Sequence, residues 1–194
     1  SNWSSSPFFP TNPGDSALFP SASATVIVSL GTPVSVAALT FNTASSYTIA
    51  QSSSGGTLIL SATSGPASIG VGNTLTAGTI SVNVPIALAS DLVLTNSATA
   101  VGGQLNRLAI NGVISGSNGI TVNGPGEVAL GGNNANFSGN FLVTNGGTLT
   151  SGGAGFGRGA VAVDSGLLQI GATGFSAPPI TTSLTLDGGA VAYT

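Results

Sequence analysis

The sequence predicts an all-β fold, namely a right-handed parallel β-helix (β-solenoid) of about eight coils. Three observations predict it: short alternating apolar and polar segments along the chain, Gly and Asn at the ends of these segments, and a pattern that recurs about every 20–23 residues. In a solenoid each coil stacks on the next at ~4.8 Å, so apolar side chains stack inside and Ser, Thr and Asn face outward. Eight coils at that rise would span roughly 40 Å.

Residues 1–20 differ in composition from the rest, because they are rich in aromatic residues and Pro. The open apolar end of a solenoid needs a cover. We therefore expect 1–20 to be an N-terminal cap or docking segment, with 21–194 forming the solenoid. A flexible leader is the alternative. The candidate cap side chains are Trp3, Phe8, Phe9 and Phe19.

Short strands are expected along the whole of the remaining chain, and no sustained 3.6-residue pattern predicts a helix. An immunoglobulin-like sandwich is the rival all-β fold, but it favours a Trp-centred core. The only Trp is Trp3, near the start of the chain. The clearest strand patterns lie at 24–30, 57–61, 80–84, 91–95 and 184–186.

Internal repeats are clearest at 119–194 and distinguish a solenoid from a sandwich. The segment 161–170 matches 184–193, and Val143 precedes Val163 at a similar interval. The Asn-Gly pairs at Asn123 and Asn145 are separated by about the same length of chain. Gly is expected at tight corners because it adopts positive φ and allows close approach, and Asn tolerates positive φ. The expected turn positions are Gly124, Gly126, Asn145, Gly146, Gly147, Asp164, Gly166, Asp187 and Gly189.

The segment 119–149 resembles the autotransporter-associated β-strand repeat. Asn123 stands where Lys is usual in that family, and Phe137 stands where Tyr is usual. The resemblance implies a β-helix passenger displayed on a bacterial surface, and the family has no shared catalytic residues. The positions that follow the family pattern are Gly124, Gly126, Leu130, Gly132, Asn136, Gly139, Val143, Gly147 and Leu149.

The charge composition excludes several classes of function. Charged residues make up only 4% of the chain, against about 25% in an ordinary soluble domain. Arg107 and Arg158 are the only cations, so neither nucleic acid nor an anionic membrane surface is an expected partner. No run of ~20 apolar residues predicts a transmembrane helix. Without Cys or His the chain is expected to bind no metal or other cofactor.

Enzymatic activity is not expected, although some β-helices act on polysaccharides. Asp164 and Asp187 occupy equivalent positions of the repeat, so they would stack one coil apart. Two carboxylates placed in this way could act as the catalytic pair of a retaining glycosidase or bind Ca²⁺ weakly. Asp before a small residue and Gly is, however, typical of a turn. A polysaccharide-active enzyme is therefore a minor alternative. Ice binding is a second minor alternative, because regular Thr arrays on a solenoid face can bind ice. The sequence has only two Thr-x-Thr pairs, Thr74/Thr76 and Thr148/Thr150, which do not make an array.

The predicted function is that of an extracellular structural solenoid. It would serve as a surface stalk or as a subunit of a head-to-tail filament held by strand-edge stacking. The chain stops within a strand pattern at 190–194, which makes Val191 and Tyr193 assembly candidates and the chain itself the expected partner. The alternative is an adhesin or carbohydrate-binding surface module that contacts surface glycans or host surfaces. No signal sequence is visible at Ser1, so we expect a secreted or bacterial cell-surface protein whose signal peptide has been removed.

Overall fold

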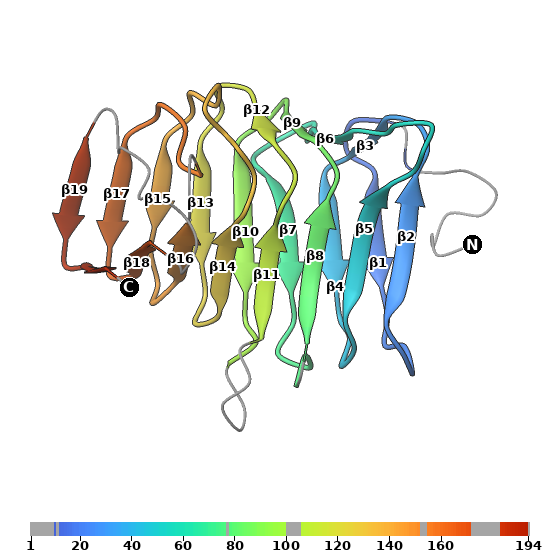
Figure 1. The fold of residues 1–194 in the computed structure, drawn as a ribbon, viewed down its shortest axis with the longest axis horizontal. Helices are drawn as coiled ribbons and strands as arrows, with labels where there is room; N and C mark the ends of the chain where they lie inside the picture. Colours follow the sequence, from blue (N-terminus) through green and yellow to red (C-terminus); the bar gives the residue numbers. More distant parts are fainter. Residues whose placement is uncertain are drawn as a thin grey trace.

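The protein is built from short strands that run parallel to one another in a stacked coil (Figure 1). The computed structural model describes residues 10, 12–76, 78–99, 106–151, 155–171 and 183–193. Within these residues there are 20 strands and no helix, and hence no helix long and apolar enough to cross a membrane. Every pairing between two strands is parallel, which confirms the predicted solenoid and rules out the sandwich alternative.

The coils share two long sheets, which we call sheet A and sheet B, each with eight strands. The predicted number of about eight coils is therefore confirmed. Sheet A consists of β1 (Ser16–Phe19), β4 (Ala38–Phe41), β7 (Ala67–Val71), β10 (Leu92–Asn96), β13 (Ile120–Asn123), β15 (Phe141–Val143), β17 (Val161–Asp164) and β19 (Leu184–Asp187). Sheet B consists of β2 (Val26–Leu30), β5 (Tyr47–Gln51), β8 (Thr79–Asn83), β11 (Arg107–Ile110), β14 (Glu127–Leu130), β16 (Thr148–Ser151), β18 (Leu167–Ile170) and β20 (Ala190–Tyr193).

A third side, sheet C, is present among the described residues in the first four coils only. Its strands are β3 (Val34–Val36), β6 (Leu58–Leu60), β9 (Ile86–Leu88) and β12 (Ile114–Ser115). In the fifth and sixth coils this side is formed by loops that carry Phe137 and Phe156. Both rings pack edge to face on Phe141, with centroid distances of 5.4 and 5.7 Å, so aromatic rings fill the interior where sheet C is absent.

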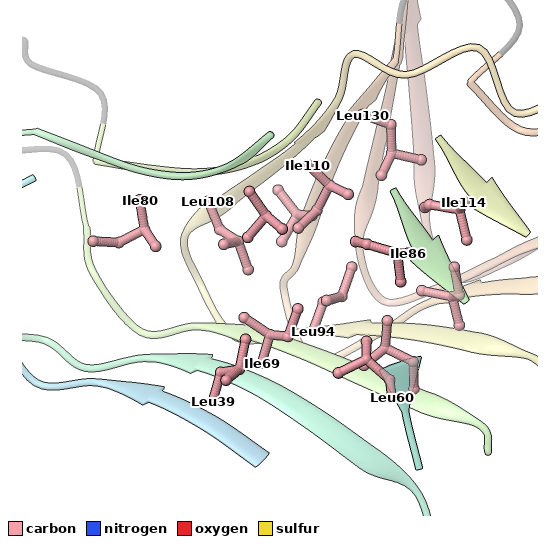
Figure 2. Packing of buried hydrophobic residues seen from close by; sticks show 14 of the residues in the cluster. Leu39, Leu60, Ile69, Ile80, Ile86, Leu94, Leu108, Ile110, Ile114 and Leu130 are labelled. Atoms are coloured by element: carbon pink, nitrogen blue, oxygen red, sulfur yellow. The ribbon is translucent and has the colours of Figure 1, made fainter. Parts of the chain in front are cut away.

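The core is formed by columns of register-paired side chains that run along the axis of the solenoid, with one side chain from each coil (Figure 2). Alternation along each strand points every second side chain inward. One column of sheet A is fully buried from the second coil to the seventh. It contains Leu39, Ile69, Leu94, Val122, Val143 and Val163.

Coil length is constant only in part of the molecule, and the predicted repeat length is wrong for the middle coils. Leu39 pairs with Ile69 and Leu94 with Val122, so these coils are longer than the sequence pattern predicts. Val122 pairs with Val143 and Val143 with Val163, and these later coils have the predicted length. The extra residues of the long coils lie in loops between strands, where stacking does not limit chain length.

The repeat that the sequence shows at 161–193 is confirmed in its register. Val161 pairs with Leu184 and Leu167 with Ala190, which is the alignment that the matching segments predict. The Asn–Gly pairs at Asn123 and Asn145 are 22 residues apart, whereas the register partners Val122 and Val143 are 21 residues apart. The two pairs therefore follow the coil length only approximately.

The first coil includes the end of the N-terminal segment 1–20. Residues 16–19 form β1, which pairs with β4, and Phe19 is fully buried. The Phe19 ring stacks on that of Phe41 at a centroid distance of 4.5 Å. Trp3, Phe8 and Phe9 lie outside the described residues, so their role as a cap stays a prediction.

Candidate functional site

The last coil exposes side chains that belong to the core columns. Val191 and Tyr193 continue the two interior columns of sheet B, directly above Leu168 and Ile170. Their exposed fractions are 37% and 74%, whereas those of Leu168 and Ile170 are 0% and 8%. The structure thus places both sequence-predicted assembly residues on one apolar surface at the end of the solenoid.

Leu184 and Leu186 belong to the same surface but were not among the predicted residues. They continue two columns of sheet A above Val161 and Val163 and are 39% and 51% exposed. The alternating pattern of 184–186 would have identified them, because it is the pattern of the buried strands before it. We call Leu184, Leu186, Val191 and Tyr193 the end surface.

The opposite end of the solenoid has no equivalent apolar surface among the described residues. In the first coil the inward side chains of Ala17, Phe19, Val28 and Leu30 are buried, with exposed fractions of 5% or less. What this coil does present is the outer edge of β1 and β2, since each of these strands pairs with one described neighbour only. The two ends therefore differ, because only the last described coil exposes apolar side chains that belong to the core columns.

Several of the predicted turn positions lie where successive coils approach closely. A Cβ on Gly126 would lie 2.5 Å from the Ala98 carbonyl oxygen of the preceding coil, and one on Gly189 would lie 2.7 Å from that of Val163. Asn145 and Gly146 both adopt positive φ, 52° and 74°. These positions shape corners of the coil, and they bring no reactive side chain together. The same is true of Gly124, Gly147 and Gly166, which lie at corners next to Asn96, Val122 and Val143.

Asp164 and Asp187 are brought together one above the other, since they are register partners in β17 and β19. Both side chains are exposed. Within the described residues there is no group of three or more His, Cys, Asp or Glu side chains that would hold a metal ion. The pair stands at the end of two strands beside Ser165 and Gly188, which both adopt positive φ, as expected for turn residues.

Two other charged residues, Arg107 and Glu127, form an ion pair. The guanidinium of Arg107 lies 3.1 Å from the Glu127 carboxylate, and the two residues are register partners in β11 and β14. Arg158 donates from Nε to the Ala135 carbonyl oxygen at 3.1 Å. Both arginines therefore stabilise contacts between coils.

Buried asparagines form a feature that the sequence interpretation missed. Asn134 accepts a hydrogen bond from the Ile114 N–H of the coil before it and donates one to the Gly155 carbonyl of the coil after it, at 2.7 and 2.8 Å. Asn96 likewise donates to the Glu127 carbonyl of the next coil at 2.7 Å. Both side chains are fully buried, so each amide connects coils from inside the solenoid.

A shallow hollow of about 340 Å³ lies on the outer face of sheet A. At its rim the Asp91 carboxylate accepts a hydrogen bond from the Gly119 N–H at 2.8 Å, and the Asn140 side-chain oxygen accepts one from the Ala160 N–H at 3.0 Å. Gly119 lies between Asp91 and Asn140 and has no side chain to fill the space. The floor is formed by the register-paired Thr121, Leu142 and Ala162. This hollow is not visible in the sequence pattern, because four separate coils contribute to it.

Comparison with known proteins identifies a relative among autotransporter adhesins. The chain is 36% identical over 136 residues, 70% of its length, to the Adhesin BmaC autotransporter of Brucella suis biovar 1 (strain 1330). The matched segment is 3% of that protein, so the chain spans only a small part of the relative's length. No family model matches the chain, and no solved structure matches it. The similarity supports a relationship to autotransporters, whereas membership of the β-strand repeat family stays a prediction.

Proposed function

We propose that this chain is a structural module of an extracellular, adhesin-like surface protein and that it acts without catalysis. The observation that carries the proposal is the uninterrupted stack of eight parallel coils, in which sheets A and B run the whole length of the described structure (Figure 1). The similarity to an autotransporter adhesin supports a place at the cell surface.

The physical properties of the stack suit a rigid spacer outside the cell. Buried columns run through successive coils, so a bend would separate side chains that are packed on both sides. The chain has no Cys or Met and is therefore resistant to oxidation. With two arginines and no Lys it also has only two sites for a trypsin-like protease.

The adhesive part of the proposal is tested with beads coated with the purified chain. Beads carrying the wild-type chain are expected to bind layers of animal cells more strongly than beads carrying albumin. Ile69→Asp, which places a charge in a fully buried column, is the unfolded control and is expected to lose the binding. Equal binding by wild-type and albumin beads would contradict an adhesive contact by this module and leave it as a spacer.

A finer proposal is that the chain assembles head to tail into a filament. The end surface supports it, because it combines strand edges that have no partner among the described residues with four exposed apolar side chains in register with the core. The first coil would contribute the free edges of β1 and β2. Such a contact does not close on itself, so repeated copies would give an open filament.

Electron microscopy and light scattering test the filament. The wild-type chain is expected to form fibres, and Val191→Asp is expected to abolish them because it places a charge in the contact. Val113→Asp is the matched control, since Val113 is a 47% exposed side chain in the fourth coil, away from both ends of the stack. A monodisperse wild-type monomer at high concentration would contradict assembly and favour the monomeric stalk.

The hollow on sheet A favours a second candidate function, the binding of surface glycans. One oxygen of each of the Asp91 and Asn140 side chains is held by a backbone N–H. The second carboxylate oxygen and the amide NH₂ have no partner among the described residues, and they would serve as acceptor and donor for sugar hydroxyls. Leu142, which is 37% exposed, offers an apolar surface to a sugar ring.

Saturation-transfer NMR with a panel of neutral mono- and disaccharides tests glycan binding. At least one sugar is expected to receive saturation from the wild-type chain, and Asp91→Ala and Asn140→Ala are expected to abolish the signal. Thr185→Ala, on the outer face of β19, is the control that retains it. Absence of a signal for every sugar would contradict this function.

A further inference from the structure

We propose that Asn123 is a site of spontaneous deamidation and that the fold selects it among four Asn–Gly steps. The other three are Asn111–Gly112, Asn118–Gly119 and Asn145–Gly146. All four steps share the Asn–Gly dipeptide, so we expect the main difference in their folded-state reactivity to come from their hydrogen bonds and their place in the coil.

The reaction needs a free backbone nitrogen and a mobile side-chain amide. The Gly nitrogen loses its proton and attacks the Asn side-chain carbonyl carbon. A C–N bond forms, and the original side-chain nitrogen leaves as ammonia after taking up a proton. Water then opens the resulting succinimide ring to aspartate or isoaspartate. The overall change is amide plus water to carboxylic acid plus ammonia, and nothing is oxidised or reduced.

At three of the steps the Gly N–H is engaged in a hydrogen bond to another coil. Gly112 donates to the Val82 carbonyl at 3.0 Å, Gly119 donates to the Asp91 carboxylate at 2.8 Å, and Gly146 donates to the Ser165 carbonyl at 2.7 Å. Each bond must break before the nitrogen attacks, because the acceptor occupies the direction of the N–H.

At two of these steps the Asn side chain is also held. The Asn111 amide donates to the Asn83 side-chain oxygen, and the Asn118 amide donates to the Leu88 carbonyl, both at 2.9 Å. These bonds run to the preceding coil and fix the amide away from the following nitrogen. Asn111 and Asn118 are thus protected twice, and Asn145 is protected once.

Asn123–Gly124 has neither form of protection among the described residues. The Asn96 carbonyl oxygen of the preceding coil accepts a hydrogen bond from the Gly126 N–H. In the described part of the chain, the backbone hydrogen bonds between these two coils therefore do not involve the Gly124 N–H at this corner. The next residue, Pro125, has no N–H and cannot form a turn bond back to Asn123. Asn123 and Gly124 are half-buried and Pro125 is exposed, so water reaches the step.

Deamidation would change the chemistry of this corner. Aspartate or isoaspartate adds one negative charge to a chain whose net charge is −3. Isoaspartate also lengthens the backbone at the end of β13, beside the close approach of Gly126 to the preceding coil. The modified chain would therefore be more acidic and locally less well packed.

Peptide mapping by mass spectrometry tests the proposal on the folded protein. Trypsin cleaves only after Arg107 and Arg158, so all four steps lie on the single peptide 108–158 and are compared within one molecule by fragmentation. After incubation at mildly alkaline pH, conversion at Asn123 is expected to be about ten-fold faster than at the other three steps, given the net cost of breaking one hydrogen bond.

Two comparisons make the outcome decisive. In denaturant the four rates are expected to converge, because the folded hydrogen bonds are gone. Asp91→Ala removes the acceptor of the Gly119 N–H and is expected to raise the rate at Asn118 while the order of the other three is unchanged. Folded-state conversion at Asn111, Asn118 or Asn145 as fast as at Asn123 would overturn the proposal. So would an unchanged preference in denaturant, or an unchanged Asn118 rate in Asp91→Ala.

Discussion

At the residue scale the fold depends on positions where one coil touches the next. Gly112 is a clear case, because a Cβ there would overlap the Val84 carbonyl oxygen. Asn134 is another, since one amide satisfies backbone groups of two different coils. At both positions the requirement comes from a neighbour one coil away along the chain, and local propensity does not reveal it.

Gly112→Ala is expected to lower the free energy of unfolding by about 1–3 kcal/mol, because the added methyl group must push two coils apart. Gly70→Ala is the matched control. A Cβ at Gly70 would have no heavy atom within 4 Å, so the change is expected to be neutral or to stabilise by up to about 1 kcal/mol. Urea unfolding followed by circular dichroism measures both. Equal losses in the two variants would contradict the close approach at Gly112.

At the element scale each strand is stable because a strand lies above and below it. β10 is paired with β7 on one side and β13 on the other, whereas β19 is paired with β17 alone among the described strands. Leu94 in β10 and Leu186 in β19 belong to the same column, yet their exposed fractions are 0% and 51%. The contribution of the same side chain to stability therefore depends on which coil carries it.

Leu94→Ala is expected to lower the free energy of unfolding by about 2–5 kcal/mol, the usual cost of a cavity in a packed core. Leu186→Ala is expected to cost well under half as much, because about half of that side chain is already exposed. Thermal and urea unfolding of the two variants gives the comparison. A larger loss for Leu186→Ala would show that the last coil is covered in solution.

The sequence was sufficient to predict the strands that carry a clear alternation, such as β8, β10 and β19, and the register of the last two coils. It was insufficient for the length of the middle coils, because loop residues between stacked strands leave no periodic signal. β12, with two residues, is too short to show alternation. At the candidate site, alternation indicated Val191 and Tyr193. The hollow beside Asp91 was not predictable, because residues of four separate coils line it.

At the scale of the whole molecule the stack is held by apolar burial and hydrogen bonds, with little help from charge. Within the described residues the Arg107–Glu127 pair is the one salt bridge, and Arg107 is partly exposed. Raising NaCl to about 1 M is expected to change the free energy of unfolding by less than about 1 kcal/mol through screening. Glu127→Gln is expected to remove that salt effect. A loss of several kcal/mol in the wild-type chain would contradict a stack held without charge.

Each coil lies in register on the one before it, and engineered disulfides across two neighbouring coils test this arrangement. The chain has no Cys, so an introduced pair reports on one contact without interference. Thr150 and Gln169 are register partners on the outer face of sheet B, and the Thr150 hydroxyl donates a hydrogen bond to the Gln169 side-chain oxygen at 3.0 Å. Neighbouring strands are separated by about 4.8 Å, within the Cα range of a disulfide.

The double variant Thr150→Cys/Gln169→Cys is expected to form an intramolecular disulfide under mild oxidation. The control double variant Thr150→Cys/Leu168→Cys is not expected to form one, because Leu168 faces the core. Failure of the first pair to cross-link, or equal cross-linking of both pairs, would contradict the stacked register.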